Sequence, residues 1–268
     1  MATTDTDSLW EQVRATGVLT GRKVHFFAQT GSTNQVALNL GRQGEEAGTL
    51  VVAESQSCGR GRLDRVWLSP PGQGLYFSII LRPRLEPADL SKITLVAALA
   101  VCKAVEEVTR LSPGIKWPND LLLAGKKFCG ILTETGPISG GKPPMVVLGI
   151  GINVLTPLDH FPAELRERVT SLAVSGVEAV RRGELLVAIV QAVEIELMRL
   201  EQGEFAAVLK DWRCRDATLG KRLAWLTPTG QVVEGVALGP DAAGVLHIRD
   251  DSGWDHEVLS GDLHLRQP

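Results

Sequence analysis

Residues 116–134 read KWPNDLLLAGKKFCGILTE. Pro118 fixes a backbone angle, and Asn119 and Asp120 favour local hydrogen bonds, so the stretch predicts a turn followed by a strand over 120–123. A second apolar run predicts a strand over 128–134. The turn could present the Lys116 ammonium to a phosphate and the Asp120 carboxylate to Mg²⁺. The alternative is an ordinary turn with Trp117 as a core residue.

Within the first 215 residues, this stretch is flanked by segments whose apolar residues recur with the period of a helix and by others with the period of a strand. Further strands are expected at 24–28, 49–53, 75–81 and 145–154. Helices are expected at 8–16, 32–42, 87–110, 183–201 and 204–213. The strands cluster without strict alternation with helices. The predicted fold class is therefore α+β, or mixed α/β, rather than a Rossmann array.

The pattern of apolar and turn residues changes near residue 216. Short apolar runs separated by turn residues follow, as expected for a small β barrel. Residues 216–268 carry four basic and eight acidic side chains, a net charge of −4, whereas residues 1–215 sum to +1. We therefore predict two domains, 1–215 and 216–268.

Composition narrows the possible functions. The 268 residues carry a net charge of −3, which argues against nonspecific nucleic-acid binding as the main role. No apolar run reaches the roughly 18 residues of a membrane span, and the polar, acidic N-terminus is not that of a signal peptide. Four scattered cysteines indicate reduced thiols and a cytoplasmic protein.

Several familiar functional motifs are incomplete or absent in this sequence. The sequence 149–153 lacks the third glycine of a dinucleotide fingerprint, and 140–143 lacks the Ser or Thr of a P-loop. There is no His-Glu-x-x-His or Gly-x-Ser-x-Gly motif, and the five histidines have no metal-ligand spacing.

Residues 56–67, QSCGRGRLDRVW, combine three arginines with two glycines. Glycine lets backbone N–H groups approach an anion, and arginine offers a planar fork to phosphate or carboxylate. The pattern predicts a mobile loop that closes over an anionic ligand. The alternative is a solvated basic loop.

Residues Ser32-Thr33-Asn34 precede an apolar helical pattern, which is typical of a helix N-cap. The N-terminus of a helix also directs N–H groups at a ligand, so capping and binding are compatible. The strands over 126–134 and 149–153 each contain glycine, which predicts close packing.

In this order, the motifs STN, GRGRxxRxW, KWPND, KxxGILxE and GIGIN resemble those of the biotin protein ligase family over residues 24–155, and a compatible C-terminal part extends the resemblance to the end. It implies a seven-stranded mixed sheet with helices, as in class II aminoacyl-tRNA synthetases and lipoate ligases, followed by an SH3-like barrel. It also implies a two-step reaction. Biotin and Mg·ATP give biotinyl-5′-AMP, and a lysine of a biotin carboxyl carrier protein then accepts the biotin.

The resemblance also implies roles for individual residues. Lys116 and Arg62 would be catalytic, and Asp120 would be a candidate Mg²⁺ ligand. The biotin site would comprise Ser32, Thr33, Asn34, Gln56, Gly59, Arg60, Gly61, Arg62, Lys116, Gly130, Ile131 and Leu132. The nucleotide site would comprise Arg62, Arg65, Trp67, Lys116, Asn119, Lys127 and Asn153. Asp64 stands where several members of the family have glycine, and we expect it to orient the neighbouring arginines.

The expected partner is a carrier protein or domain of acetyl-CoA, acyl-CoA or pyruvate carboxylase, and a homodimer is possible. Only 23 residues precede the first predicted strand, whereas two helices and a wing need roughly 60, so we expect ligase activity without DNA binding. Two other interpretations remain open. They are a lipoate ligase and a nucleic-acid module, the latter opposed by the −4 charge of the tail.

Overall fold

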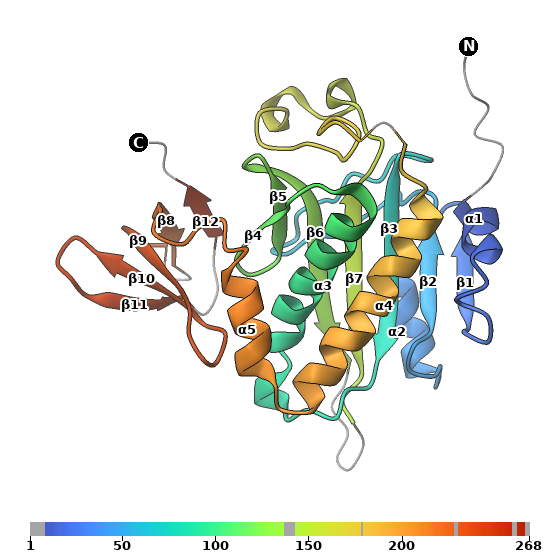
Figure 1. Cartoon of the computed structure of the whole chain (residues 1–268), viewed down its shortest axis with the longest axis horizontal. Helices are drawn as coiled ribbons and strands as arrows, with labels where there is room; N and C mark the ends of the chain where they lie inside the picture. Colours follow the sequence, from blue (N-terminus) through green and yellow to red (C-terminus); the bar gives the residue numbers. More distant parts are fainter. Residues whose placement is uncertain (1–8, 137–142, 178, 228–229, 259–261, 266–268) are drawn as a thin grey trace.

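A seven-stranded mixed sheet forms the centre of the larger part of the chain in a computed structural model (Figure 1), which describes residues 9–136, 143–177, 179–227, 230–258 and 262–265. The strand order is β1-β2-β3-β7-β6-β5-β4. The β1–β2 pair is parallel and the other pairs are antiparallel. The strands are β1 (Val24–Phe27), β2 (Leu50–Ala53), β3 (Gly74–Leu81), β4 (Gly114–Lys116), β5 (Asp120–Leu123), β6 (Lys126–Thr135) and β7 (Val146–Asn153). The sheet that the resemblance implied is confirmed.

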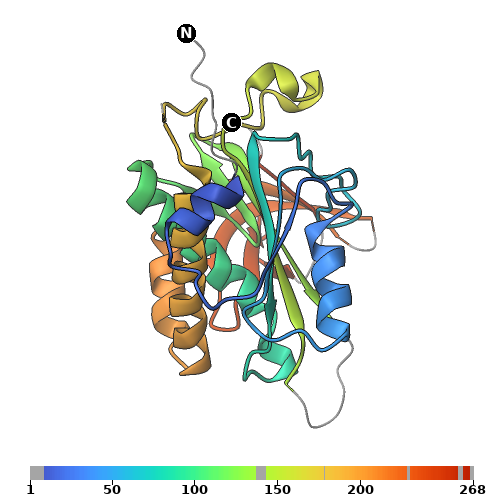
Figure 2. The ribbon, with the colours of Figure 1, turned by 90° about the vertical axis from the view of Figure 1, so that its right-hand side faces the viewer.

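Helices cover both faces of this sheet (Figure 2). On one face α3 and α4 pack together, and their apolar side chains form the main core with residues such as Phe77, Leu148 and Ile150. On the other face α2 covers a smaller cluster around Val51, Ile80 and Val147. The helices are α1 (Leu9–Ala15), α2 (Thr33–Arg42), α3 (Lys92–Thr109), α4 (Arg182–Glu201) and α5 (Phe205–Arg213), with short 3₁₀ turns η1 (Pro87–Asp89), η2 (Leu158–His160) and η3 (Ala163–Leu165).

The predicted elements are found with two differences. The helix expected from residue 87 begins as η1, and α3 starts at Lys92 because the chain first makes i→i+3 bonds such as Leu90 N to Pro87 O. Strand β4 was not predicted. The first residue of the helix expected at 8–16, part of the 227–230 turn and residues 140–142 of the rejected P-loop lie outside the described residues.

A second, five-stranded antiparallel sheet follows α5, in the order β11-β10-β9-β8-β12. Its strands are β8 (Arg222–Leu226), β9 (Val232–Pro240), β10 (Leu246–Asp250), β11 (Asp255–Val258) and β12 (Asp262–Leu265). This small antiparallel sheet is consistent with the SH3-like domain that was expected. A backbone bridge joins Asp216 to Ile115 of β4, and the Trp117 indole donates to the Gly244 carbonyl.

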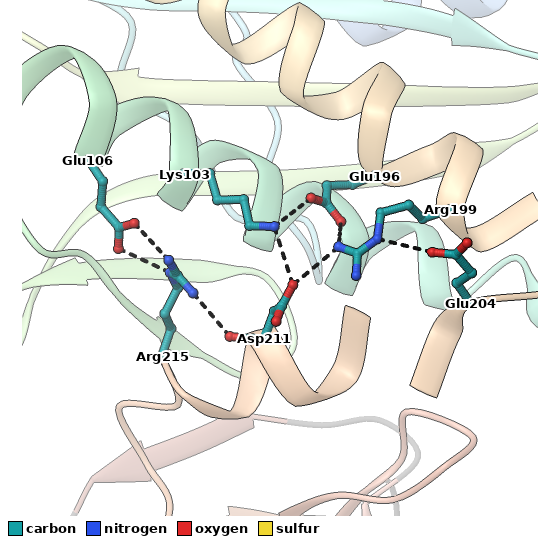
Figure 3. A network of polar contacts seen from close by, with 7 residues as sticks. All are labelled: Lys103, Glu106, Glu196, Arg199, Glu204, Asp211 and Arg215. Atoms are coloured by element: carbon teal, nitrogen blue, oxygen red, sulfur yellow. Dashed lines mark hydrogen bonds and ion pairs between the residues drawn. The ribbon is translucent and has the colours of Figure 1, made fainter. Parts of the chain in front are cut away.

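Charged side chains join α3, α4 and α5 at the face away from the sheet (Figure 3). Glu196, whose side chain is 3% exposed, accepts from Lys103 and Arg199, both at 2.7 Å. Asp211 also contacts both cations, at 3.4 and 3.2 Å. Although partial burial alone would raise the pKa of Asp211, hydrogen bonds from Arg199 and Lys103 hold it below its usual value.

None of the helices in the described residues has the length and apolar character needed to cross a membrane. The four cysteines, all within the described part of the chain, are unpaired.

Candidate functional site

The candidate site lies on the α2 side of the sheet, where the central strands carry almost no side-chain bulk. Gly130 of β6 pairs with Gly151 of β7, and Gly149 pairs with Ser78 of β3. Residues two apart on a strand share a face, so these four form one continuous surface. A Cβ at Gly151 would overlap the Trp67 indole, and one at Gly130 would lie 3.0 Å from its Cζ3. We call these three glycines and Ser78 the glycine floor. The expectation that the strand glycines allow close packing is confirmed.

Asn34, the second residue of α2, lies over the Gly149 end of this floor. Its side chain is buried, and a Cβ at Gly149 would overlap its carboxamide. The Ser78 hydroxyl donates to Asn34 Oδ1 at 2.6 Å, and Asn34 Nδ2 donates to the Leu132 carbonyl at 3.2 Å and to Glu134 at 2.9 Å. Every polar atom of this amide is therefore satisfied within the protein.

The N-terminus of α2 is capped from a distance. Ser32 occupies the N-cap position but makes no side-chain cap hydrogen bond, contrary to the expected local cap. Instead Gln56 Oε1 accepts from the Thr33 backbone N–H at 2.8 Å and lies 3.2 Å from Thr33 Oγ1. Gln56 Nε2 donates to Ser69. Three of the residues predicted for the biotin site, Ser32, Thr33 and Gln56, therefore lie together, and Gln56 also stabilises the helix.

Residues 56–67, which we call the arginine loop, fold into a small hairpin. Arg60 and Val66 form a bridge, and Gly61 N–H donates to the Arg65 carbonyl at 2.7 Å. The tip is Leu63-Asp64, and both residues have left-handed backbone angles, with φ of 54° and 56°. Aspartate tolerates this conformation better than most residues, so it can stand where several members of the family have glycine. That Asp64 orients the neighbouring arginines stays a prediction.

Two polar side-chain contacts join the arginine loop to β6 and to the turn before β5, in addition to the packing of Trp67. Arg60 Nη1 lies 3.0 Å from Glu134 Oε1 on β6. Arg62 Nη1 donates to Asn119 Oδ1 at 3.1 Å, and Asn119 Nδ2 in turn donates to the Ile131 carbonyl at 2.9 Å. The loop is thus joined to the Glu134 end of the KxxGILxE strand and to the turn of KWPND.

Lys127 lies beside the glycine floor. Its Nζ is 5.3 Å from the centre of the Trp67 ring and 2.5 Å from Asp120 Oδ1. Asp120 pairs across β4–β5 with Lys116, so the two side chains share a face. The sequence placed Lys127 only at the nucleotide and Lys116 at the centre of the chemistry; the structure places Asp120 in contact with Lys127 and in register with Lys116.

Asn153 lies at the end of β7, against a segment that also pairs with Lys127. Its side chain is 4% exposed, and Nδ2 donates to the Thr170 carbonyl at 3.0 Å. The 170–172 segment therefore lies against the end of β7. Arg65 is exposed on the outer limb of the arginine loop.

A cavity of about 280 Å³ opens next to Arg62, between the N-terminal end of α3, β6 and the turn 243–245 of the second sheet. Ile131 and Leu132 line it, as do Trp117 and Gly244. Sequence reasoning gave no role to Glu134 or Ser78, which both hold the Asn34 side chain in place. A lone serine in the apolar run GLYFSIIL was a signal for Ser78, whereas Glu134 was already part of a motif but had no role.

The described residues do not offer a resident metal centre. No group of three His, Cys, Asp or Glu side chains among them is placed to hold a metal ion. The candidate ligand Asp120 has one oxygen in an ion pair with Lys127.

Sequence comparison gives this geometry a context. The profile of the Biotin/lipoate A/B protein ligase family matches residues 26–153. The biotin–[acetyl-CoA-carboxylase] ligase of Mycobacterium tuberculosis is 34% identical over 251 residues, covering 91% of this chain and 90% of that protein. The chain belongs to the biotin protein ligase family. The bifunctional ligase/repressor BirA of Bacillus subtilis is 36% identical over 87% of this chain and 71% of its own length.

Solved structures of the ligase family agree. A biotin protein ligase from Aquifex aeolicus, solved in complex with biotin and ATP, has a TM-score of 0.77 and 31% identity, covering 92% of this chain and 99% of its own. The predictions of family, fold class and enzyme class are therefore confirmed.

Proposed function

We infer that this chain activates biotin with ATP and transfers it to a lysine of a biotin carboxyl carrier protein. In the first step a biotin carboxylate oxygen bonds to the α-phosphorus, and the bond to pyrophosphate breaks. In the second step the lysine nitrogen attacks the carbonyl carbon of biotinyl-5′-AMP, AMP leaves, and the nitrogen loses a proton. The observation that carries the proposal is the grouping of Arg60, Arg62 and Lys127 around the glycine floor of a member of this family.

The chemistry needs such a site. The first step joins two anions, and fixed cations lower its barrier by neutralising charge as the bond forms. The intermediate is a mixed anhydride that water would hydrolyse, so the site must enclose it. The buried Trp67 Nε1 has no partner within the described residues, and an acceptor on a bound ligand would satisfy it.

We propose that the individual roles follow the sequence motifs. Lys116 and Arg62 would stabilise charge in the reaction, and Lys127 would join them because of its position beside Trp67. Gly130, Ile131 and Leu132 would form a wall of the biotin pocket. The rest of the biotin site would be formed by Ser32, Thr33, Asn34, Gln56, Gly59, Arg60 and Gly61. The nucleotide would be bound by Arg65, Trp67, Asn119 and Asn153. Mg²⁺ would enter as Mg·ATP.

A direct assay tests the function. The protein is incubated with Mg·ATP, biotin and a carrier domain, and the carrier is weighed by mass spectrometry. The expected result is a mass increase equal to one biotin less one water. Lipoate in place of biotin distinguishes the runner-up, because a lipoate ligase would drive pyrophosphate exchange with lipoate instead. No mass increase on the carrier and no biotin-dependent exchange would contradict the proposal.

Three further predictions need their own measurements. The expected carrier belongs to acetyl-CoA, acyl-CoA or pyruvate carboxylase, and comparing these carriers as substrates identifies it. DNA binding is checked by an electrophoretic shift, and homodimerisation by the mass in solution with and without ligands.

A further inference from the structure

We propose that Glu134 is a positioning residue that ties the arginine loop to the N-terminal end of α2 and so slows the escape of the reaction intermediate. This inference rests on the proposed function. Glu134 lies near the carboxyl end of β6, where it belongs to the KxxGILxE motif but has no role in the reaction described above.

The two carboxylate oxygens of Glu134 serve two separate elements. Oε1 lies 3.0 Å from Arg60 Nη1 in the arginine loop. Oε2 accepts from Asn34 Nδ2 on α2 at 2.9 Å. These partners are 26 residues apart in sequence, so the carboxylate adds a second link between the arginine loop and α2, beside the hydrogen bond from Thr33 to Gln56. A carboxylate suits the position because it accepts at both oxygens, whereas an amide offers only one acceptor.

The Asn34 side of this link is rigid. Asn34 is 4% exposed, and its amide is also bound by Ser78 and by the Leu132 carbonyl. The Arg60 side is mobile by comparison, since its side chain is 43% exposed, against 20% for Glu134. The contact therefore restrains the arginine loop at a fixed position relative to α2. Its loss should make the loop more mobile and leave the helix in place.

Glu134 is one of several attachment points of the arginine loop. The others include the hydrogen bond from Arg62 to Asn119, the hydrogen bond from Thr33 to Gln56 and the packing of Trp67 on the glycine floor. With Glu134 removed the loop keeps the Arg62 contact and the cations stay near the reacting groups. We therefore expect bond formation to continue, while the loop opens more often and the intermediate leaves faster.

Glu134→Gln tests the proposal in the full-length enzyme. Intermediate formed from labelled ATP and biotin is chased with excess unlabelled biotin and ATP, and its release is followed. Loss of one charged hydrogen bond should accelerate release about tenfold. Biotin-dependent pyrophosphate exchange at saturating substrates should stay within about twofold of the wild type. Arg249→Gln, which breaks an exposed ion pair with Asp255 in the second sheet, is the matched control.

A double-mutant cycle separates positioning from a general structural effect. If Glu134 acts through Arg60, Glu134→Ala should accelerate release much less in an Arg60→Ala background than in the wild type. Additive effects would overturn the proposal, as would unchanged release from Glu134→Gln. A drop in melting temperature that accounts for the change would point instead to a purely structural role. If the wild type itself forms no intermediate with biotin, the proposed function fails and not this inference.

Discussion

Asp120 lies beside two lysines of the site that come from different strands. Lys127 forms an ion pair with it at 2.5 Å, and Lys116 is its cross-strand neighbour. Two lysines and one carboxylate leave this corner of the site with a net positive charge. This grouping supplies the positive charge that joining two anions requires.

Replacing either lysine should block activation. We expect Lys116→Ala and Lys127→Ala each to lower biotin-dependent pyrophosphate exchange at least 100-fold, since each removes a fixed positive charge from the site. Far-ultraviolet circular dichroism should be unchanged, because both side chains are partly exposed. Exchange at the wild-type rate in one variant would show that its lysine has no catalytic role. Lys126→Ala, on the neighbouring residue of β6, is the control.

The tip of the arginine loop carries backbone strain at Leu63. A leucine in the left-handed region costs about 1 kcal/mol relative to a residue that adopts it readily. Leu63 is 61% exposed, so Leu63→Asn relieves this strain and gives up little burial. We expect protease cleavage within residues 57–66 of the ligand-free enzyme to slow about fivefold. Faster or equal cleavage would contradict the expected gain in loop order.

At the scale of elements, two helices and the ends of two strands meet at a buried ion pair. Arg182, at the start of α4, is 4% exposed and contacts Glu54 at 2.7 Å and the Gly74 carbonyl at 3.1 Å. Glu54 also accepts from the backbone N–H of Leu9 at 3.0 Å, where α1 begins. The pair therefore fixes α1 and α4 against the ends of β2 and β3.

Breaking this pair should be costly. Glu54→Ala leaves a buried guanidinium without its counter-charge, and we expect the free energy of unfolding to fall by about 3–5 kcal/mol. Urea denaturation followed by circular dichroism measures the change. A loss below about 1 kcal/mol would indicate that water or a rearranged partner replaces Glu54.

Periodicity predicted most elements, because long helices and alternating strands leave a local signature. It missed β4, which has three residues and a single fully buried side chain, Ile115. The identity of β4 comes from pairing with β5 and from a bridge to Asp216, about 100 residues away. The division into domains at residue 216 stays a prediction.

The candidate site, like the fold, was only partly predictable from the sequence. Motif order predicted which residues gather, because each motif is local. It did not predict their partners. Gln56 caps a helix that starts 23 residues earlier, and Arg62 meets Asn119 across 57 residues. Contacts of this kind depend on the fold, so no local pattern specifies them.

At the scale of the whole molecule, the turn 243–245 joins the two sheets. Trp117 is 7% exposed and donates its indole N–H to Gly244 O at 3.0 Å. Gly244 has a φ of +85°, and a Cβ there would lie 2.8 Å from Leu95. The second sheet thus supports the turn that carries Asn119, and through it Arg62.

Trp117→Phe should weaken this support. The ring remains buried, but Gly244 O loses its donor, which costs about 1–3 kcal/mol. We expect a lower melting temperature and faster release of the intermediate, because Asn119 is held less firmly. Unchanged release with a lower melting temperature would confine the contact to stability. Trp254→Phe, on the exposed turn before β11, is the control.

Acid should loosen the second sheet before the first. Six carboxyl groups in the described residues have a lowered pKa, and four lie in the second sheet: Asp241, Asp250, Asp251 and Asp255. For Asp251 and Asp255 the cause is hydrogen bonds from Arg222 and Arg249, and for Asp250 it is bonds from Ser252 and His256. A lowered folded-state pKa stabilises above the unfolded value, near 4, and this stability is lost as the pH falls below it.

Hydrogen exchange followed by mass spectrometry, compared at pH 7 and near pH 3, shows which of the two sheets loses protection first as the pH falls. Peptides from 230–258 should lose protection at a higher pH than those from α3 and β7. Simultaneous loss of protection would contradict the prediction and indicate that the two sheets unfold as one unit.

The glycine floor also sets how the enzyme could be redesigned for bulkier or modified acids. Positions 130, 149 and 151 have no side chain left to trim, so space for a larger substrate cannot come from the strands. It must come from the opposite wall, where Trp67 is the one large side chain in contact with both Gly130 and Gly151 among the residues described. Directed evolution for new labelling chemistry should therefore start at position 67 and leave the strands unchanged.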